Sequence, residues 1–317
     1  MEQYVRLMNQ VIQEVRKVVI GKDEIIVKVL TAILAKGHIL IEDIPGVGKT
    51  TLALAFSKVL NLDYHRMQFT PDVLPSDVVG FHIYDQKEQE PTFKKGSIFC
   101  NLFLADEINR TSSKTQSALL EVMEEASVTV DAVTFMMPKP FVVIATQNPI
   151  GSVGTQMLPE SQLDRFMVRL SMGYPDMASE VEILKGRSQV EPLNHVSKVL
   201  DISELVQMQM AAEQIFVHEA IYQYIATLVL GTRDHDLIAL GVSPRGTLAL
   251  TAMAKAYAML CGRTYVIPDD VRAIFREVTM HRMVLKPKAR VNNVTMDMII
   301  EQILANVVAP RLVVKQS

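Results

Sequence analysis

A glycine-rich segment, Asp43 to Thr50, has the residue types and spacing that most clearly indicate chemistry. It reads Asp-Ile-Pro-Gly-Val-Gly-Lys-Thr and lies between an apolar stretch of strand length and a stretch of helical periodicity. Gly46 and Gly48 allow backbone N–H groups to curl around phosphate oxygens at the positive end of the following helix. Lys49 is then expected to reach the β- and γ-phosphates, and the Thr50 hydroxyl to ligate Mg²⁺. The pattern predicts a P-loop that binds a nucleotide.

The loop departs from the general P-loop pattern at Asp43, which stands where the first glycine is usual. This departure leaves the curl at Gly46 and Gly48 intact. Val47 and Thr51, inside and directly after the loop, are further expected nucleotide contacts. A strand-turn-helix junction that matches by chance is the alternative, and such a match arises in roughly one chain in a hundred of this length.

Two adjacent carboxylates, Asp106 and Glu107, follow the apolar run Leu-Phe-Leu-Ala at 102–105. In a P-loop protein, a buried strand that ends in acids supplies the other half of the site. We expect Asp106 to hold Mg²⁺, directly or through water, and Glu107 to polarise the water that attacks the γ-phosphate. Acids that simply end a strand in solvent are the alternative.

A third apolar run, residues 141–146, is followed by Gln147, Asn148 and Pro149. At the carboxyl end of a strand beside the P-loop, Asn148 is placed to contact the γ-phosphate or the attacking water. An Asn-Pro turn without a ligand is the alternative. No Asn-Lys-x-Asp motif for reading guanine occurs in the sequence, which argues against a GTPase.

These segments require a scaffold that brings strand ends together. Short apolar runs at 38–42, 98–105 and 141–146 alternate with segments of helical periodicity. This alternation predicts an α/β domain with a mainly parallel sheet between helices. The polar segment 81–95 is typical of an exposed hairpin or a loop insertion, and 128–135 of a second hairpin. Ser113-x-x-Gln116 predicts a capping box at the start of a helix.

The second half of the chain has a different pattern. After residue 175 the strand signals fade and helical periodicity takes over, with helices expected to start at Pro244 and Pro268. We therefore expect residues 1–175 to form the α/β nucleotide-binding domain and residues 176–317 to form an all-helical lid domain.

Composition excludes several classes of protein. The formal net charge is −3 and the chain is 21% charged, so there is no global basic field for nucleic acid. Lys286, Lys288 and Arg290 form only a small basic run, typical of a solvated loop. The two cysteines show neither a disulfide framework nor metal-ligand spacing, which favours a reduced, cytoplasmic protein. No apolar run reaches the roughly 20 residues that span a bilayer, and residues 1–17 do not read as a signal peptide.

Five motifs, taken together, carry a family resemblance. They occur in this order: PGVGKT at 45–50, LFLADEINR at 102–110, ATQNP at 145–149, LPESQLDRF at 158–166 and SPRG at 243–246. Each is moderately specific alone, but five in sequence with plausible spacing are very specific. The chain closely resembles the MoxR family of AAA+ ATPases over nearly its whole length.

The resemblance implies roles that spacing alone does not give. Arg165 corresponds to an arginine finger that a neighbouring subunit supplies, with Arg169 as a substitute, and Arg245 to a second-sensor arginine at the start of a lid helix. The segment Val19-Ile20-Gly21 resembles the one against which adenine packs, so Ile20 is an expected contact. Each assignment has an alternative. Arg165 could instead pair with a surface carboxylate, and Arg245 could contact only solvent. Val19 and Ile20 could simply belong to the apolar core.

The resemblance also implies cofactors and partners. ATP and Mg²⁺ are expected, in a homo-oligomer that forms a hexameric ring. The client is expected to be a protein that is remodelled or matured, alongside a partner with a von Willebrand factor type A domain, and neither nucleic-acid binding nor membrane insertion is expected. The segment at 81–96 looks like the family's insertion in the second helix of the core, and 128–135 like its hairpin before the asparagine strand.

Three rival classes remain open on the sequence. An AAA+ nucleic-acid motor or loader shares the same ATPase parts and predicts stimulation by DNA. A non-hydrolysing nucleotide-binding scaffold predicts a defect at Glu107 or Arg165, and neither position is defective. A small-molecule P-loop kinase predicts an acceptor pocket and a monomer.

Overall fold

The computed structural model describes residues 1–85, 90–148, 157–186 and 192–311. Its centre is a five-stranded sheet with the order β2-β5-β8-β1-β9, and all of its pairings are parallel. The strands are β1 (Ile39–Glu42), β2 (Tyr64–Gln68), β5 (Leu102–Asp106), β8 (Val142–Gln147) and β9 (Val168–Leu170). The predicted parallel sheet is confirmed, and the three apolar runs supply its three inner strands.

Both faces of the sheet are covered, which is why its inner strands are apolar at successive positions. Ile39 and Ile41 pack in one core with helices α1 (Glu2–Arg16), α2 (Asp23–Leu34) and α3 (Lys49–Val59). Leu40, which lies between them, packs in a second core with helix α5 (Ser113–Glu125). Helices therefore cover both faces of the sheet.

The sheet differs from the prediction at its two edges and at one strand start. β2 and β9 were not predicted, because β2 is a mostly exposed polar edge strand and β9 is only three residues long. The strand expected at 98–105 begins at Leu102, since the chain turns at 97–101 and the Cys100 N–H donates to the Ile98 carbonyl at 2.7 Å.

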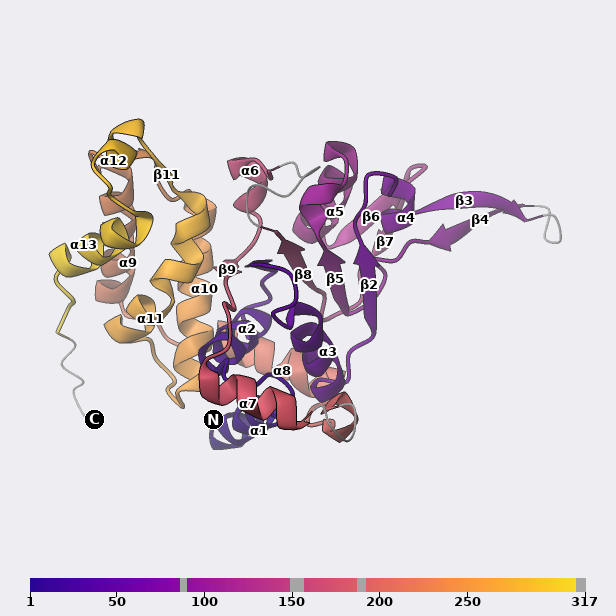
Figure 1. The fold of residues 1–317 in the computed structure, drawn as a ribbon, viewed down its shortest axis with the longest axis horizontal. Coiled ribbons are helices and arrows are strands. Elements are labelled where there is room, and N and C mark those ends of the chain that lie inside the picture. The colour runs from indigo at the N-terminus through magenta and orange to yellow at the C-terminus, as the bar shows by residue number, and fades with distance from the viewer. Residues whose placement is uncertain (86–89, 149–156, 187–191, 312–317) are drawn as a thin grey trace.

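Two antiparallel hairpins extend from the α/β part. Strand β3 (Gly80–Asp85) pairs with β4 (Glu90–Lys95), and β6 (Ser127–Val130) pairs with β7 (Val133–Met136). Both predicted hairpins are confirmed, except that residues 86–89 lie outside the described part. The short helix α4 (Pro75–Val79) leads into β3, and the β3–β4 hairpin projects away from the sheet on the side opposite α9–α13 (Figure 1).

The start of α5 corrects one expectation. Its N-cap is Ser112, whose Oγ accepts from the Thr115 N–H at 3.3 Å, and Ser113 is already the first residue of the helix, so the predicted capping box of Ser113 and Gln116 is wrong. Gln116 has a different role, because its Nε2 donates to the Ile108 carbonyl at 3.1 Å. That contact ties α5 to the short 3-10 turn η1 (Ile108–Arg110), which follows the acids of β5.

The second half is helical, as predicted, and helices start at Pro244 and Pro268. The short helix α6 (Glu160–Leu163) comes before β9, in the first half. The elements of the second half are α7 (Met177–Gly186), η2 (Pro192–His195), α8 (Ile202–Glu213), α9 (Glu219–Arg233), α10 (Pro244–Leu260), α11 (Pro268–Thr279), η3 (Met280–Arg282), α12 (Pro287–Val291) and α13 (Met296–Asn306). The one pairing of strands in the described part of this half joins β10 (Ile238–Leu240) to β11 (Val284–Leu285).

Helices α9–α13 are gathered at one end of the molecule, and α11 contacts the edge strand β9, whereas α8 packs on α2 (Figure 1). A single apolar core includes side chains of α1–α3 and of α8–α11 and α13. The domain boundary near 175 therefore stays a prediction, because packing is continuous across it. Among the described helices, none combines the length and apolar character needed to cross a membrane.

Candidate functional site

The P-loop joins the end of β1 to the start of α3. Gly46 and Gly48 adopt left-handed backbone angles, with φ of 87° and 95°. A Cβ atom at Gly46 would meet nothing within 4 Å, so the loop requires glycine there for its backbone conformation and not for space. Because α3 begins at Lys49, the free N–H groups of its first turn face the loop and form an anion-binding end.

The Lys49 ammonium group lies buried inside this loop. Its Nζ donates to the Asp43 carbonyl at 2.6 Å and to Oδ1 of Asn148 at 3.5 Å. Burial lowers the pKa of Lys49, and the nearby carboxylates of Asp43, Asp106 and Glu107 oppose that shift. The positive charge is therefore held at the point where the P-loop and the ends of β5 and β8 meet.

Asp43, the departure from the P-loop pattern, has a structural role that the sequence did not show. Its Oδ2 accepts from the Gly173 N–H at 2.6 Å and from the Ser171 hydroxyl at 3.0 Å, and its Oδ1 accepts from the Ile44 N–H at 2.8 Å. The buried carboxylate thus ties the start of the P-loop to the segment between β9 and α7.

Asp106 ends β5 and is largely buried. Its Oδ1 accepts from the Thr146 hydroxyl of β8 at 2.6 Å, and its Oδ2 accepts from Arg66 of β2 at 2.7 Å. Strands on both sides of β5 therefore fix this carboxylate. Arg66 was not predicted, because it comes from the edge strand that the sequence did not indicate.

Glu107 follows directly, with φ of 57°, a turn that directs its side chain away from the strand line. Its Oε1 accepts from Asn148 Nδ2 at 2.9 Å. Its Oε2 accepts from Gln68 Nε2 and from Arg110, each at 2.8 Å. Gln68 and Arg110 were also missed, although Arg110 stands three residues after Glu107 within the 102–110 motif.

The donors around Glu107 control its ionisation. Burial alone would raise the pKa of Glu107, but hydrogen bonds from Arg110 and Asn148 outweigh it and lower the pKa below its usual value. The carboxylate is thus kept ionised and oriented. It can accept a hydrogen bond from a water molecule next to the P-loop, which is what a general base requires.

One cavity of about 370 Å³ collects these groups. It is lined by Pro45, Gly46, Gly48, Lys49, Thr50, Thr51, Arg66, Gln68, Asp106, Glu107 and Asn148. Thr50 and Asp106 present hard oxygen atoms to the same space, which fits a Mg²⁺ ion bound together with phosphates. Val47 does not line the cavity, since its side chain packs against the apolar core.

Arg165 and Arg245 lie together elsewhere. Arg165 Nε is 3.2 Å from Oε2 of Glu124, on α5, and Arg245 donates to Oε1 of the same carboxylate. Neither arginine lines the P-loop cavity of its own chain. The sequence left open that Arg165 pairs with a surface carboxylate, and within the single chain it does pair with Glu124.

The two weaker sequence assignments lie apart from the cavity lining. Arg169, on β9, contacts Glu42 at 3.3 Å within the sheet. Ile20 is partly buried beside the buried Val19, and a Cβ on Gly21 would come within 2.0 Å of the Ser179 Oγ of α7. The segment therefore packs closely against α7, and its contact with adenine stays a prediction. Pro149 lies outside the described residues.

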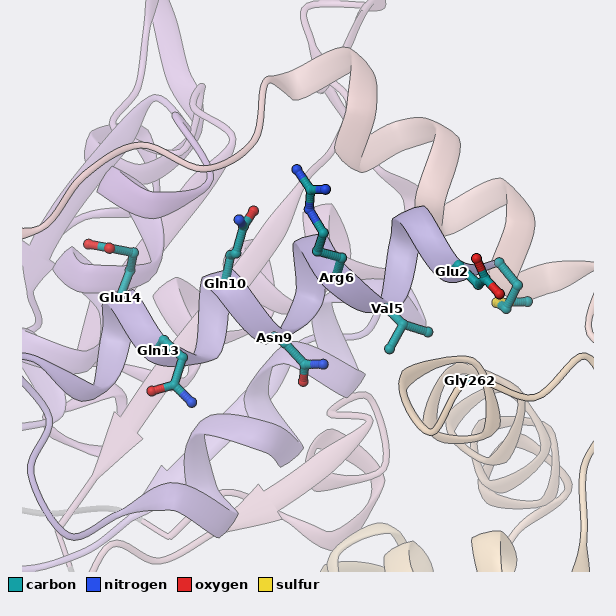
Figure 2. Close-up of a pocket in the computed structure, with 9 residues that line it drawn as sticks. Glu2, Val5, Arg6, Asn9, Gln10, Gln13, Glu14 and Gly262 are labelled. Atoms are coloured by element: carbon teal, nitrogen blue, oxygen red, sulfur yellow. The ribbon is translucent and has the colours of Figure 1, made fainter.

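A larger cavity, about 650 Å³, runs along α1 on another part of the surface. Figure 2 shows Arg6, Gln10 and Glu14 along one side of α1, with Val5 directed towards the turn at Gly262. None of the residues predicted to bind the nucleotide or act on it lines this cavity. Its amide side chains offer no phosphate cradle, so the smaller P-loop cavity is the candidate active site.

Comparison with known proteins agrees with this geometry. Residues 38–168 match the model of the ATPase family associated with various cellular activities (AAA), and residues 230–303 match the AAA lid domain. The matched core contains the P-loop and the ends of β5 and β8. The matched lid contains Arg245.

Individual relatives extend the match to nearly the full chain. The Bacillus subtilis protein YeaC, described as uncharacterised, is 44% identical over 96% of this chain and 95% of its own length. Chaperone MoxR1 of Mycobacterium tuberculosis is 38% identical over 97% of this chain and 84% of its own. A crystal structure of a candidate ATPase from Cytophaga hutchinsonii superposes with a TM-score of 0.90 at 36% identity, covering 98% of this chain and 96% of that one. The chain belongs to the MoxR family of AAA+ ATPases.

Proposed function

We propose that this protein hydrolyses ATP in a Mg²⁺-dependent reaction as a homo-oligomer, a hexameric ring, and uses the reaction to remodel or mature a protein partner. The observation that carries the proposal is the hydrogen-bonded series Lys49–Asn148–Glu107 at the mouth of the P-loop. It joins a phosphate-binding cation to an ionised carboxylate within one cavity.

Each residue then has a defined part in the reaction. The P-loop N–H groups and Lys49 bind the phosphates, and Asn148 keeps the Glu107 carboxylate directed into the cavity. Thr50 and Asp106 would hold Mg²⁺, which when bound neutralises negative charge on the phosphates. Glu107 accepts a proton from the attacking water at one of its carboxylate oxygens.

The arginines extend the proposal to a second copy of the chain. Arg165 and Arg245 share Glu124 and stand outside the P-loop cavity of their own chain, which supports a role for both in the site of a neighbouring copy. There an arginine neutralises charge on the transferring phosphoryl group, worth on the order of 10³–10⁵ in rate. The site is then complete only in the oligomer.

The client proposal rests on relatives and not on residues of the site. Chaperone MoxR1 is named for a chaperone role, which supports a protein client. The proposal also includes a partner with a von Willebrand factor type A domain, which the family resemblance implies, and a location in the cytoplasm. A nucleic-acid motor is the competing function, and the formal net charge of −3 argues against it.

The specific ATPase rate, measured against protein concentration with Mg²⁺ or EDTA, tests this function. We expect a rate per subunit that rises with concentration, needs Mg²⁺ and is unchanged by single-stranded DNA. A concentration-independent rate that DNA stimulates would favour the nucleic-acid motor instead.

Glu107→Gln tests the assignment of the base. We expect this variant to bind ATP with near-normal affinity and to lose about 10²- to 10⁴-fold in turnover, because the amide cannot accept a proton. Glu121→Gln, at an exposed position on α5, is the matched control and should turn over normally. Near-normal turnover by Glu107→Gln would remove Glu107 from the mechanism.

A further inference from the structure

Glu124, on α5, brings together two arginines that are 80 positions apart in sequence. It contacts Arg165, which follows α6, through Oε2 at 3.2 Å, and it accepts a hydrogen bond from Arg245 of α10 through Oε1. Each arginine presents one face to this carboxylate, and both remain partly exposed, with side-chain exposures of 29% for Arg165 and 44% for Arg245. The pair is therefore arranged on the surface and not buried in a core.

The backbones that carry the two arginines are joined by a second carboxylate. Asp164, directly before Arg165, accepts a hydrogen bond from the Ser243 hydroxyl at 2.9 Å. Ser243 is the N-cap of α10, two residues before Arg245. The turn that carries Arg165 and the start of α10 are thus connected within one chain.

A buried arginine reinforces that junction. Arg282, whose side chain is 1% exposed, donates from Nε to Asp164 Oδ1 at 2.8 Å. It also donates to the carbonyl of Phe166 at 2.6 Å, on the other side of Arg165. The backbone on both sides of Arg165 is therefore held against the lid by a side chain that has no room to move.

Two guanidinium groups brought to one place repel each other. A shared anion offsets that repulsion and favours an arrangement in which the two groups stay together. Glu124 is that anion, since it bonds to one arginine through each oxygen. Asp164 holds the backbones, and Glu124 holds the side chains.

We propose that Glu124 is a positioning residue that couples Arg165 to Arg245, so that the two arginines act as one unit on the nucleotide of a neighbouring copy. The coupling follows from the contacts of Glu124, whereas the action on a neighbouring copy rests on the proposed function. Glu124 itself does not touch the nucleotide. Its loss lets the side chains separate while the backbone junction at Asp164 stays intact.

Glu124→Gln, compared with Glu125→Gln, tests the coupling. The control changes the same charge at the next position of the same helix, at an exposed residue. We expect Glu124→Gln to lower the ATPase kcat by about 10- to 100-fold, as misplaced catalytic groups do, with the ATP KM and the affinity for a fluorescent ADP analogue changed less than about twofold. Glu125→Gln should match the parent chain in all three quantities.

A mutant cycle provides the second readout. In the Arg165→Ala background, Glu124→Gln and Arg245→Ala should each add less than about twofold to the loss in kcat, because residues that act as a unit are not additive. Additive losses would show that the arginines act separately and would overturn the coupling. We expect the thermal unfolding midpoint and the oligomeric state of each variant to equal those of Glu125→Gln. This result would show that the loss in kcat comes from lost positioning and not from misfolding.

The outcomes distinguish this inference from the function it rests on. If Arg165→Ala retains the parent kcat, the shared-site proposal itself fails. If Arg165→Ala loses activity while Glu124→Gln retains it, only the role of Glu124 fails. If both lose activity with unchanged nucleotide affinity and the cycle is non-additive, Glu124 is the positioning residue.

Discussion

The P-loop cavity and the Arg165–Arg245 pair are built in different ways. In the cavity, Lys49 at the start of α3 and Asn148 and Glu107 at the ends of β8 and β5 hydrogen-bond to one another in series. The arginine pair comes from separate surface segments, and both side chains share the carboxylate of Glu124 while they remain partly exposed. The P-loop cavity is preorganised for chemistry, whereas the Arg165–Arg245 pair is placed on the surface, where a second molecule can contact it.

The difference explains what each region contributes. Preorganised donors in a buried cavity lower the barrier without further rearrangement when the nucleotide binds. In the proposed oligomer, the exposed arginine pair contributes only when a neighbouring copy brings a phosphate next to it. Hydrolysis can therefore be made conditional on assembly without any change in the P-loop.

The largest expected effect comes from the arginine region. Arg165→Ala should lower the ATPase rate at high protein concentration on the order of 10³-fold, because the charge on the transferring phosphoryl group loses its neutralising partner. Nucleotide affinity, measured by titration, should stay near that of the parent chain. Arg169→Ala is the comparison that decides between the two candidate fingers: a larger loss there would move the role to β9.

An intermediate effect is expected inside the P-loop region. Asp43→Asn keeps the shape of the side chain. However, its amide has only one oxygen, a weaker acceptor, and an NH₂ group that cannot accept a hydrogen bond, whereas the carboxylate accepts from three donors. Such a mismatch in a buried site costs about 1–3 kcal/mol. We expect a lower unfolding midpoint and roughly tenfold weaker ATP binding, where each 1.4 kcal/mol is tenfold. Asp234→Asn, at the exposed end of α9, should change neither quantity.

The smallest effect on function is expected at His38, directly before β1, where the expected change is in stability. The Val143 N–H donates to Nδ1 at 3.0 Å, so Nε2 carries the proton and donates to the Met123 carbonyl at 2.9 Å. Burial lowers the pKa of His38 to about 4, and the bond to Met123 only partly opposes this. A second proton on Nδ1 would displace the Val143 bond.

The sign of the pH dependence follows from that lowered pKa. Below about pH 6.5 the unfolded chain binds a proton at His38 that the folded chain does not, so the free energy of unfolding falls as the pH falls towards 4. The full shift corresponds to about 3 kcal/mol. Urea unfolding at pH 7 and pH 5 should show a smaller difference for His38→Gln than for the parent chain, whereas the exposed His195→Gln should not reduce it.

The sequence predicts the P-loop region well, because its parts follow one another along a few apolar strands. Asp106, Glu107 and Asn148 each come at or just after the carboxyl end of an apolar run, and parallel strands bring those ends to one edge. Arg66 and Gln68 escaped prediction since their strand is polar and exposed, with no periodicity to distinguish it from a loop. The contacts of Asp43 with Ser171 and Gly173 arise because β9 pairs with β1, and no local sequence pattern shows that pairing.

The arginine region was predictable only through family resemblance. Nothing in the residues around 165 or 245 indicates that both side chains meet at position 124, because the meeting depends on three segments packed in space. The structure places them together and away from their own P-loop. Their action on a neighbouring copy stays a prediction.

A mixing experiment tests the shared site most directly. Glu107→Gln subunits keep their arginines but lack the base, whereas Arg165→Ala subunits keep the base but lack the finger. Mixed at a concentration where the parent chain is fully active, they should hydrolyse ATP well above the sum of their separate rates, because an intact site then meets an intact arginine from its neighbour. A rate equal to that sum, in mixtures shown to contain hetero-oligomers, would contradict a site completed by a second copy.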